Sequence, residues 1–154
     1  MRIFYIFFTA IFFLNPILFA QKNTQYEFKF ETLSIKDGLS QGMINAIIQD
    51  QYGFMWFATN DGLNRFDGYN FTIYKNNVED TNSIAGNFIR FLFEDSKGRL
   101  WIATANNGLD LFDRETENFI HFKHNVNNSN SISSNSITSI SEDKFGHIDR
   151  KSVV

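Results

Sequence analysis

A repeat with a period of 45 to 48 residues constrains the fold of this chain more than any other feature. Residues 49–59 (QDQYGFMWFAT) match residues 94–104 (EDSKGRLWIAT) at a spacing of 45, and later matches continue at spacings of 46 and 48. A period in the mid-forties suits a four-stranded β-propeller blade, and insertions in loops account for the drift in spacing. The sequence therefore predicts an all-β fold made of β-propeller blades.

The recurring positions form an Asp-Gly-Trp-Thr series, followed by Gly-Leu and then by Phe-Asp. They are Asp50, Gly53, Trp56, Thr59, Gly62, Leu63, Phe66 and Asp67 in the first copy, Asp95, Gly98, Trp101, Thr104, Gly108, Leu109, Phe112 and Asp113 in the second, and Asp143 and Gly146 in a third. An Asp that opens a tight turn accepts backbone N–H bonds, and Gly suits the last turn position. A Trp between apolar neighbours suits a strand buried between two blades. We interpret all these residues as a structural repeat motif.

Four short strands fit each repeat, and turn signals separate them. In the first copy the expected strands are residues 44–49, 55–59, 63–66 and 71–74. The Asn60-Asp61-Gly62 and Asp67-Gly68 segments supply residues that tolerate positive φ at hairpin turns. Aromatic residues make up 17% of the chain, which favours packed strands.

The repeats divide the chain into about two blades and the start of a third, an incomplete ring. We expect a lead-in at 21–38, propeller repeat 1 at 39–83, repeat 2 at 84–131 and a truncated repeat 3 at 132–148. Residues 26–33 are similar to the fourth strand of a repeat, so we predict that they complete the last blade and close the ring. Because a blade buries its faces only against neighbouring blades, we do not expect these blades to fold stably alone.

The first 20 residues are predicted to be a secretory signal peptide. They carry a single cation, Arg2, and continue through an apolar run that Asn15 and Pro16 interrupt. A membrane anchor would need about 20 uninterrupted apolar residues, which is longer than this run. We expect cleavage between Ala20 and Gln21, and therefore an exported protein.

Residues 149–154 (DRKSVV) do not continue the repeat. In the earlier copies the equivalent segment leads into a Trp strand, whereas here it is charged. The string resembles the translation of a sequencing adapter, and we interpret it as an artefact.

Composition narrows the chemistry that these residues can perform. The chain has no cysteine, which excludes disulfides and thiolate chemistry. Its net charge is −3 and it has no basic patch, so a nucleic-acid partner is not expected for this part of the protein.

The repeat resembles a known family. The string Asp-x-x-Gly-x-x-Trp-[Phe/Ile]-x-Thr, followed by Gly-Leu-x-x-Phe-Asp, is similar to the two-component regulator propeller repeat, and so is the lead-in from Asp37 to Gln41. The resemblance covers about residues 32–148. It implies the extracytoplasmic sensor of a hybrid two-component histidine kinase, with the phosphotransfer chemistry in sequence outside this chain.

The resemblance also implies a partner and a location. The ligand would be a small molecule such as an oligosaccharide, and its binding would control transcription of genes for using that nutrient. The whole protein would be anchored in the inner membrane as a dimer, with the propeller on the periplasmic side. Two alternatives stay open: an exported propeller with another function, such as a hydrolase or a surface-binding protein, and a propeller sensor with a DNA-binding or cyclase output.

Candidate catalytic and metal-binding residues do not form a recognisable site. His121 and His124 lie three apart, and residues three apart on a strand face opposite sides. His147 occupies a turn position. Asp50, Asp95 and Asp143 recur with the repeat, whereas catalytic groups are normally unique within a ring. We predict no catalytic residue, no metal and no cofactor in these residues.

Polar loop residues are the remaining candidates for ligand contact. The Asn-rich run at 125–135 aligns with residues 76–87, and we interpret it as a loop that joins two blades. The residues that could hydrogen-bond sugar hydroxyls are Asn60, Asp61, Asn64, Arg65, Asn106 and Asn107. Turn formation is the favoured interpretation of these residues, so the sequence does not define a binding site.

Overall fold

The computed structural model describes residues 27–152. The expected signal peptide and its cleavage site at Ala20 and Gln21 lie outside the described residues. The chain divides into two units at Glu31, and every described strand belongs to the second unit. Residues 27–33 form neither strand nor helix. The predicted ring-closing strand thus has no counterpart here, and its pairing with a last blade stays a prediction.

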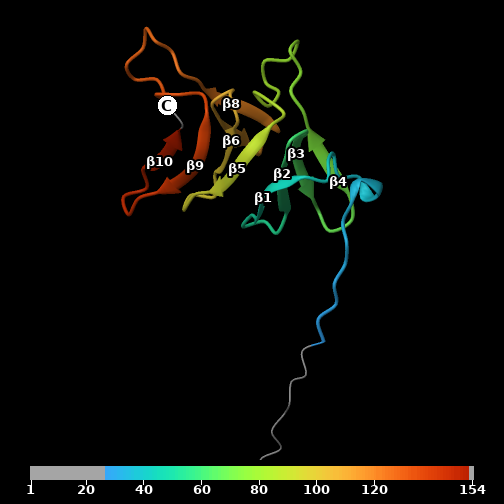
Figure 1. Ribbon diagram of the computed structural model, residues 1–154. Helices are drawn as coiled ribbons and strands as arrows, with labels where there is room; N and C mark the ends of the chain where they lie inside the picture. Colours follow the sequence, from blue (N-terminus) through green and yellow to red (C-terminus); the bar gives the residue numbers. More distant parts are fainter. Residues whose placement is uncertain (1–26, 153–154) are drawn as a thin grey trace, which may run out of the picture. The chain divides into compact units, whose positions relative to one another are not determined.

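Ten strands make up the second unit, and they form three antiparallel sheets (Figure 1). A short 3₁₀ helix, η1 (Ile35–Asp37), precedes them. The first sheet contains β1 (Ile44–Gln49), β2 (Met55–Thr59), β3 (Gly62–Phe66) and β4 (Phe71–Tyr74). The second contains β5 (Ile89–Glu94), β6 (Leu100–Thr104), β7 (Leu109–Asp113) and β8 (Asn118–Phe122). The third contains β9 (Ile137–Glu142) and β10 (Ile148–Ser152).

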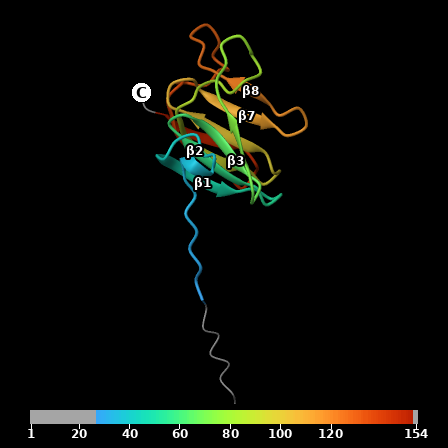
Figure 2. The same cartoon turned by 90° about the vertical axis from the view of Figure 1, so that its right-hand side faces the viewer.

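Each four-stranded sheet is one propeller blade, which confirms the predicted fold class. The strands of both blades pair in chain order, and the first-copy bounds agree with the expected ones except that β3 begins one residue earlier, at Gly62. β1 packs beside β5, and β5 packs beside β9. These three strands are therefore the inner strands, and each sheet extends outward from its own inner strand. Figure 2 looks onto blade 1 (cyan to green), with blade 2 (yellow to orange) behind it.

The core between blades 1 and 2 is built around Trp56. This side chain has no exposed surface, and its ring meets that of Phe112 edge-on at 5.1 Å between centroids. Leu63 from blade 1 and Leu92 and Ile102 from blade 2 belong to the same cluster. Burying each large apolar side chain contributes about 1.5–3 kcal/mol. The motif Trp is thus a core residue of the interface between neighbouring blades.

The second interface repeats this arrangement one blade further on. Trp101, Ala103 and Leu109 of blade 2 pack against Ile137 and Ile140 of β9. At both interfaces, the face of one sheet that carries the motif Trp therefore packs against the opposite face of the next sheet.

A β-bulge recurs at one position of all three inner strands. In β1 the register shifts between Ile44 and Ala46, which leaves Asn45 as the extra residue. Arg90 is the extra residue in β5, and Thr138 is the extra residue in β9. Bulges bend a strand and redirect a side chain, so this device sets three polar side chains at the same level of the inner strands.

Strand β10 includes residues 149–152, which the sequence analysis set apart. They pair with β9 in antiparallel register, from Asp149 opposite Ser141 to Ser152 opposite Ile137. Asp149 occupies the position of the motif Trp, and it is exposed. The third sheet therefore lacks the buried aromatic ring that the other two carry.

Candidate functional site

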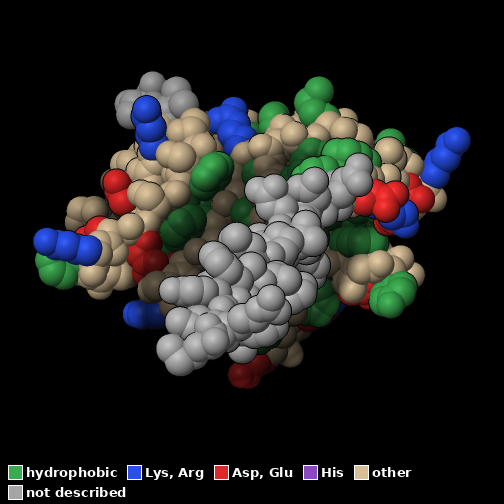
Figure 3. Space-filling model, turned by 90° about the horizontal axis from the view of Figure 1, so that it is seen from below, with side chains coloured by type: hydrophobic (Ala, Val, Ile, Leu, Met, Phe, Trp, Pro, Cys, Tyr) green, Lys and Arg blue, Asp and Glu red, His purple; other side chains and the backbone are tan. Residues whose placement is uncertain are grey.

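The blades have two ends with different loops. The β1–β2 and β3–β4 turns lie at one end, called the turn end below, together with the corresponding turns of blade 2. The β2–β3 turn and the long connections between blades lie at the other, called the connection end, which is the top in Figure 1. Figure 3 looks onto the turn end and shows hydrophobic side chains interspersed with charged ones.

At the turn end, the motif Asp organises its own turn and the motif Trp. One carboxylate oxygen of Asp50 accepts the N–H groups of Tyr52 and Phe54, both at 3.0 Å. The other accepts the indole N–H of Trp56 at 2.7 Å. Burial raises the pKa of Asp50, but the hydrogen bonds from Trp56, Arg114 and the backbone outweigh it, so this pKa lies below its ordinary value. The buried carboxylate is therefore ionised and fully engaged in the fold.

The second copy has the same geometry. Asp95 accepts the N–H groups of Lys97 and Arg99 and, at 2.8 Å, the indole N–H of Trp101. Its pKa is also lowered, because these bonds outweigh burial. In the third copy His147 occupies the position of Arg99, and its imidazole contacts Asp143 at 3.0 Å. The recurring carboxylates thus hold their own turns.

Carboxylates also join neighbouring blades at the turn end. Glu94 accepts the N–H of Gln51 from the preceding blade at 2.9 Å, and Arg114 bridges Glu94 and Asp50 at 3.0 and 2.7 Å. At the next interface Glu142 accepts the N–H of Ser96 at 2.8 Å. The last residues of β5 and β9 therefore reach back to the turn of the blade before them.

The motif Thr and Gly form the β2–β3 turn at the connection end. The hydroxyl of Thr59 donates to the carbonyl of Gly62 at 2.8 Å, and that of Thr104 donates to the carbonyl of Gly108 at 2.7 Å. Both glycines have positive φ, and a Cβ on Gly62 would lie 2.7 Å from the carbonyl oxygen of Tyr74. Glycine is therefore required by both conformation and space.

The connections between blades share one hydrogen-bond pattern. The N–H groups of Asn76 and His124 donate to the side chains of Asn87 and Asn135, both at 2.7 Å. The Asn76 amide donates to the carbonyl of Ile84, and Nδ1 of His124 bonds to the equivalent carbonyl of Ile132. The Asn-rich run is thus an ordered loop that joins blades 2 and 3, as expected from its alignment with the first loop.

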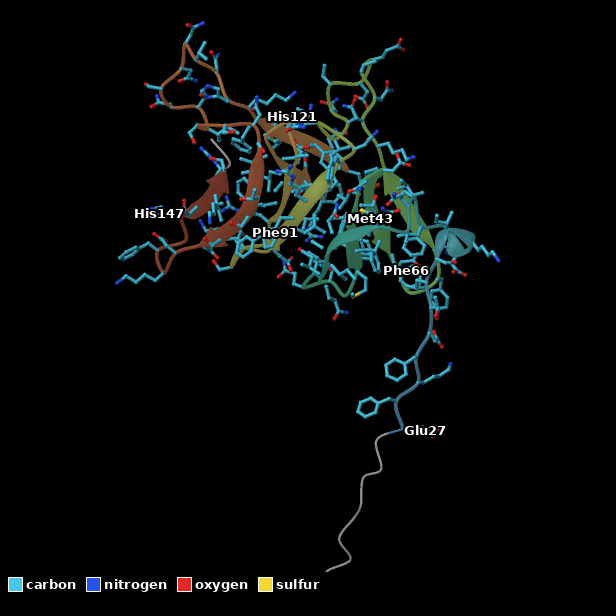
Figure 4. The ribbon with its side chains drawn as sticks, in the orientation of Figure 1. Glu27, Met43, Phe66, Phe91, His121 and His147 are labelled. Carbon is cyan, nitrogen blue, oxygen red and sulfur yellow. The ribbon has the colours of Figure 1, made fainter. Side chains whose placement is uncertain are left out.

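The bulge residues lie at the connection end of the inner strands, and Asn45 and Arg90 bridge adjacent blades. Asn45 donates to the carbonyl of Ile89 at 2.7 Å and to the side chain of Asn60 at 2.8 Å. Arg90 donates to the hydroxyl of Ser136 at 3.1 Å. Among residues 27–152 no carboxylate lies within salt-bridge distance of Arg90 (the labelled Phe91 and Met43 locate this region in Figure 4). We call Asn45, Arg90 and Thr138 the channel-mouth residues, because the inner strands of a closed propeller would surround a central channel.

The structure separates the six candidate ligand residues of the sequence. Asn60 adjoins the channel mouth through Asn45, while Asn106 and Asn107 are exposed in the equivalent turn of blade 2. Asp61 forms a salt bridge with Lys75 at 2.7 Å. The other two are engaged in packing: Asn64 is fully buried against Ser40, and Arg65 pairs with Glu117 near the turn end.

One pair of polar residues was missed by sequence reasoning. Asp110 is fully buried in β7, and its carboxylate contacts Nδ1 of His121 in β8 at 2.6 Å. Burial raises the pKa of Asp110, and the contact with His121 partly opposes the rise. In the β7–β8 hairpin Asp113 pairs with Asn118, and this register places Asp110 opposite His121. A sequence prediction of that hairpin turn would therefore have paired the two residues.

No group of three or more metal-binding side chains occurs within the described part of the chain. None of the described helices is long and apolar enough to span a membrane.

Comparisons with known proteins agree with this architecture. The sequence model of the "Two component regulator propeller" family matches residues 38–61 and 83–106, one segment in each blade. A curated relative, "Histidine kinase P4" of Formosa agariphila, is 50% identical over 58 residues, which are 38% of this chain and 4% of that protein.

Solved structures of two proteins from B. thetaiotaomicron are similar in fold. The extracellular domain of BT3049, described as a hybrid two component system, is 34% identical with a TM-score of 0.70, over 75% of this chain and 16% of that one. The extracellular domain of BT4673 is 27% identical with a TM-score of 0.57, over 71% and 15%. It is described as a one component system in one structure and as a hybrid two component system in another. The chain thus spans a small part of each relative.

The blades, their motif contacts and these similarities define a class of protein: a β-propeller built from repeated four-stranded blades. In particular, two segments of the chain match the two component regulator propeller family, and the chain is similar to the extracellular domain of a hybrid two component system.

Proposed function

We propose that this chain is part of the extracytoplasmic ligand-sensing propeller of a hybrid two-component histidine kinase. The observation that carries the proposal is the match of both blades to the regulator propeller repeat, together with the likeness to the extracellular domain of BT3049. In the whole protein, ligand binding would change the activity of a kinase encoded elsewhere in the sequence. The propeller would lie on the periplasmic side of the inner membrane in an anchored dimer.

The channel mouth is the proposed place for the ligand. Asn45, Arg90 and Thr138 come from three successive inner strands, and the same bulge sets all three at one level. Amide, guanidinium and hydroxyl groups are the donors and acceptors that bind sugar hydroxyls. Exposed Met43 and Phe88 each lie two residues before a bulge residue and offer apolar surface for the face of a sugar ring. We therefore propose a nutrient oligosaccharide as the ligand. Its binding would control transcription through the kinase.

The test is ligand-dependent autophosphorylation of the full-length protein in lipid vesicles, with a panel of oligosaccharides added on the propeller side. We expect one class of oligosaccharide to change the rate, and R90Q to raise the required ligand concentration about tenfold, which corresponds to about 1.4 kcal/mol. R99Q is the matched control, because Arg99 belongs to the same blade but pairs with Asp95 at the turn end. If R90Q leaves the response unchanged, the channel mouth is not the ligand site. If the full-length protein has no kinase activity, the histidine kinase is not its output.

A second candidate is a propeller sensor whose output is a DNA-binding or cyclase domain. The description of BT4673 as a one component system in one of its structures favours considering it. In that case ligand would change DNA binding or nucleotide cyclisation by the full-length protein, with no phosphorylated histidine.

A further inference from the structure

The connection between blades 1 and 2 is fastened to blade 2 by two side chains. The carboxylate of Asp110 accepts the N–H of Ala85 at 2.7 Å, and Nε2 of His121 contacts the carbonyl oxygen of Thr81 at 2.9 Å. A backbone bond from Phe119 to Asn82 at 2.9 Å lies between them. His121 therefore touches Asp110 with one ring nitrogen and the connection with the other.

The acceptors around the imidazole fix its number of protons. A carbonyl oxygen only accepts, so Nε2 carries the hydrogen that points to Thr81. A second proton must lie between Nδ1 and Asp110, on either atom, because a carboxylate and a bare ring nitrogen at 2.6 Å would repel each other. With both contacts made, the pair holds one proton more than a neutral imidazole beside an ionised carboxylate.

We propose that His121 and Asp110 form a proton-dependent latch that holds the blade 1–blade 2 connection and releases it at Thr81 as the pH rises. When the extra proton leaves, one N–H remains for two acceptors. The charge-assisted bond to the Asp110 carboxylate is the stronger, so the ring keeps it and turns a lone pair toward the Thr81 carbonyl. The contact at Thr81 is then lost, while the Ala85 bond to Asp110 stays.

Solvent and the surrounding charges are compatible with this titration. His121 lines a pocket of about 280 Å³ together with Asp80 and Thr81 of the connection and Lys123. The charged or titratable groups that face it are Asp110 from β7, Asp80 from the connection and Lys123 just beyond β8. The pair binds the extra proton in the latched state. The stability that the latch contributes is therefore present at low pH and is lost as the pH rises and the pair releases that proton.

Blade 1 shows that this latch is an addition to the repeat. The positions of Asp110 and His121 are occupied there by Asn64 and Ile73, which lie opposite each other in the same hairpin register. Asn64 still accepts the lead-in N–H of Ser40 at 2.8 Å, as Asp110 accepts that of Ala85. The D110N/H121I variant therefore copies a pair that the fold already uses, without a titrating group.

Hydrogen exchange of the full-length protein tests the latch, with rates corrected for the intrinsic pH dependence of exchange. We expect protection of residues 77–86 to fall about tenfold between about pH 5 and about pH 9, which is the range that spans histidine titration. In D110N/H121I the protection should stay constant across this range. H124N is the control, because it restores the Asn of the equivalent first connection and should leave the fall in 77–86 unchanged.

Peptides from β5 and β6, residues 89–104, report whether each variant keeps the blade folded. If D110N/H121I lowers the protection of these peptides, the single variant H121Q is used in its place. H121Q keeps Asp110 and removes only the imidazole ring. Wild-type protection that is constant with pH would overturn the proposal. So would an equal fall in the variants that lack His121.

Discussion

The indole N–H of Trp56 donates to a buried carboxylate oxygen of Asp50 at 2.7 Å, and Trp101 and Asp95 repeat this bond at 2.8 Å. The bond joins the turn that ends an inner strand to the core of the blade interface. It explains why Asp and Trp recur six residues apart: one carboxylate closes the turn and fixes the indole that the next blade covers.

Replacing the Asp50 carboxylate should therefore destabilise the interface between the blades as well as the turn. In D50N, the nitrogen that replaces one carboxylate oxygen can no longer accept from Trp56 or Arg114. Hydrogen bonds to charged groups are worth about 1.5–3 kcal/mol, so we expect a loss of about 2–4 kcal/mol, measured as a lower unfolding midpoint of the propeller in urea. D67N is the control, because Asp67 bonds only to nearby backbone groups of an exposed turn. Equal effects of the two variants would contradict this role.

The same carboxylates predict acid sensitivity. The pKa values of Asp50 and Asp95 are lowered in the folded protein, so their contribution to stability is complete above the ordinary pKa of 3.8. It is lost as pH falls below that value toward the folded pKa. Thermal unfolding between about pH 5 and about pH 2 should show a falling midpoint, and D50N should flatten the fall. A fall of the same steepness in D50N would assign the acid sensitivity to other groups.

Glycine at the β2–β3 turn should tolerate no side chain. In G62A the new Cβ meets the Tyr74 carbonyl oxygen at 2.7 Å, at a φ of 112°. Gly68 has a similar φ of 98° but no atom within 4 Å of a Cβ, so G68A bears only the conformational cost, about 1 kcal/mol. We expect G62A to lower the unfolding free energy by at least about 1 kcal/mol more than G68A. Equal losses would mean that the close approach is relieved by a backbone shift.

The two connections predict an exchangeable pair of residues. Asn76 and His124 make the same side-chain contact with the carbonyl of the residue eight positions later. We expect H124N to change the unfolding free energy by less than about 0.5 kcal/mol at neutral pH, because amide and imidazole donors replace each other. H124A should cost about 1 kcal/mol more, since it leaves the carbonyl without this donor. A large loss in H124N would show that the imidazole has a further role.

Local patterns carried most of the fold into the sequence prediction. The spacing of Asp, Trp and Gly gave the strands and turns of blade 1 nearly to the residue, because each signal acts within one hairpin. The contacts that join blades were not visible in the same way. Arg114 contacts Asp50, which lies 64 positions earlier in the sequence. The residue types at these two positions do not predict that they pair.

The three bulge positions were not predicted for a related reason. Asn45, Arg90 and Thr138 are different residue types, so they do not appear as a motif, although their spacing follows the repeat. A bulge becomes visible only when paired strands fix the register. Conversely, Asn64 and Arg65 resembled ligand-binding residues by composition, and the structure places them in packing contacts.

The packing of one blade onto the next through its Trp face is the central claim, and a crystal structure of the whole extracytoplasmic region tests it most directly. Phe57 and Phe71 lie together on the face of blade 1 that corresponds to the covered face of blade 2. We predict that a further blade covers these rings with its own Trp side and that Asn45, Arg90 and Thr138 line one channel. A structure in which this face of blade 1 is open to solvent, or in which β1 and β5 are not adjacent inner strands, would contradict the account.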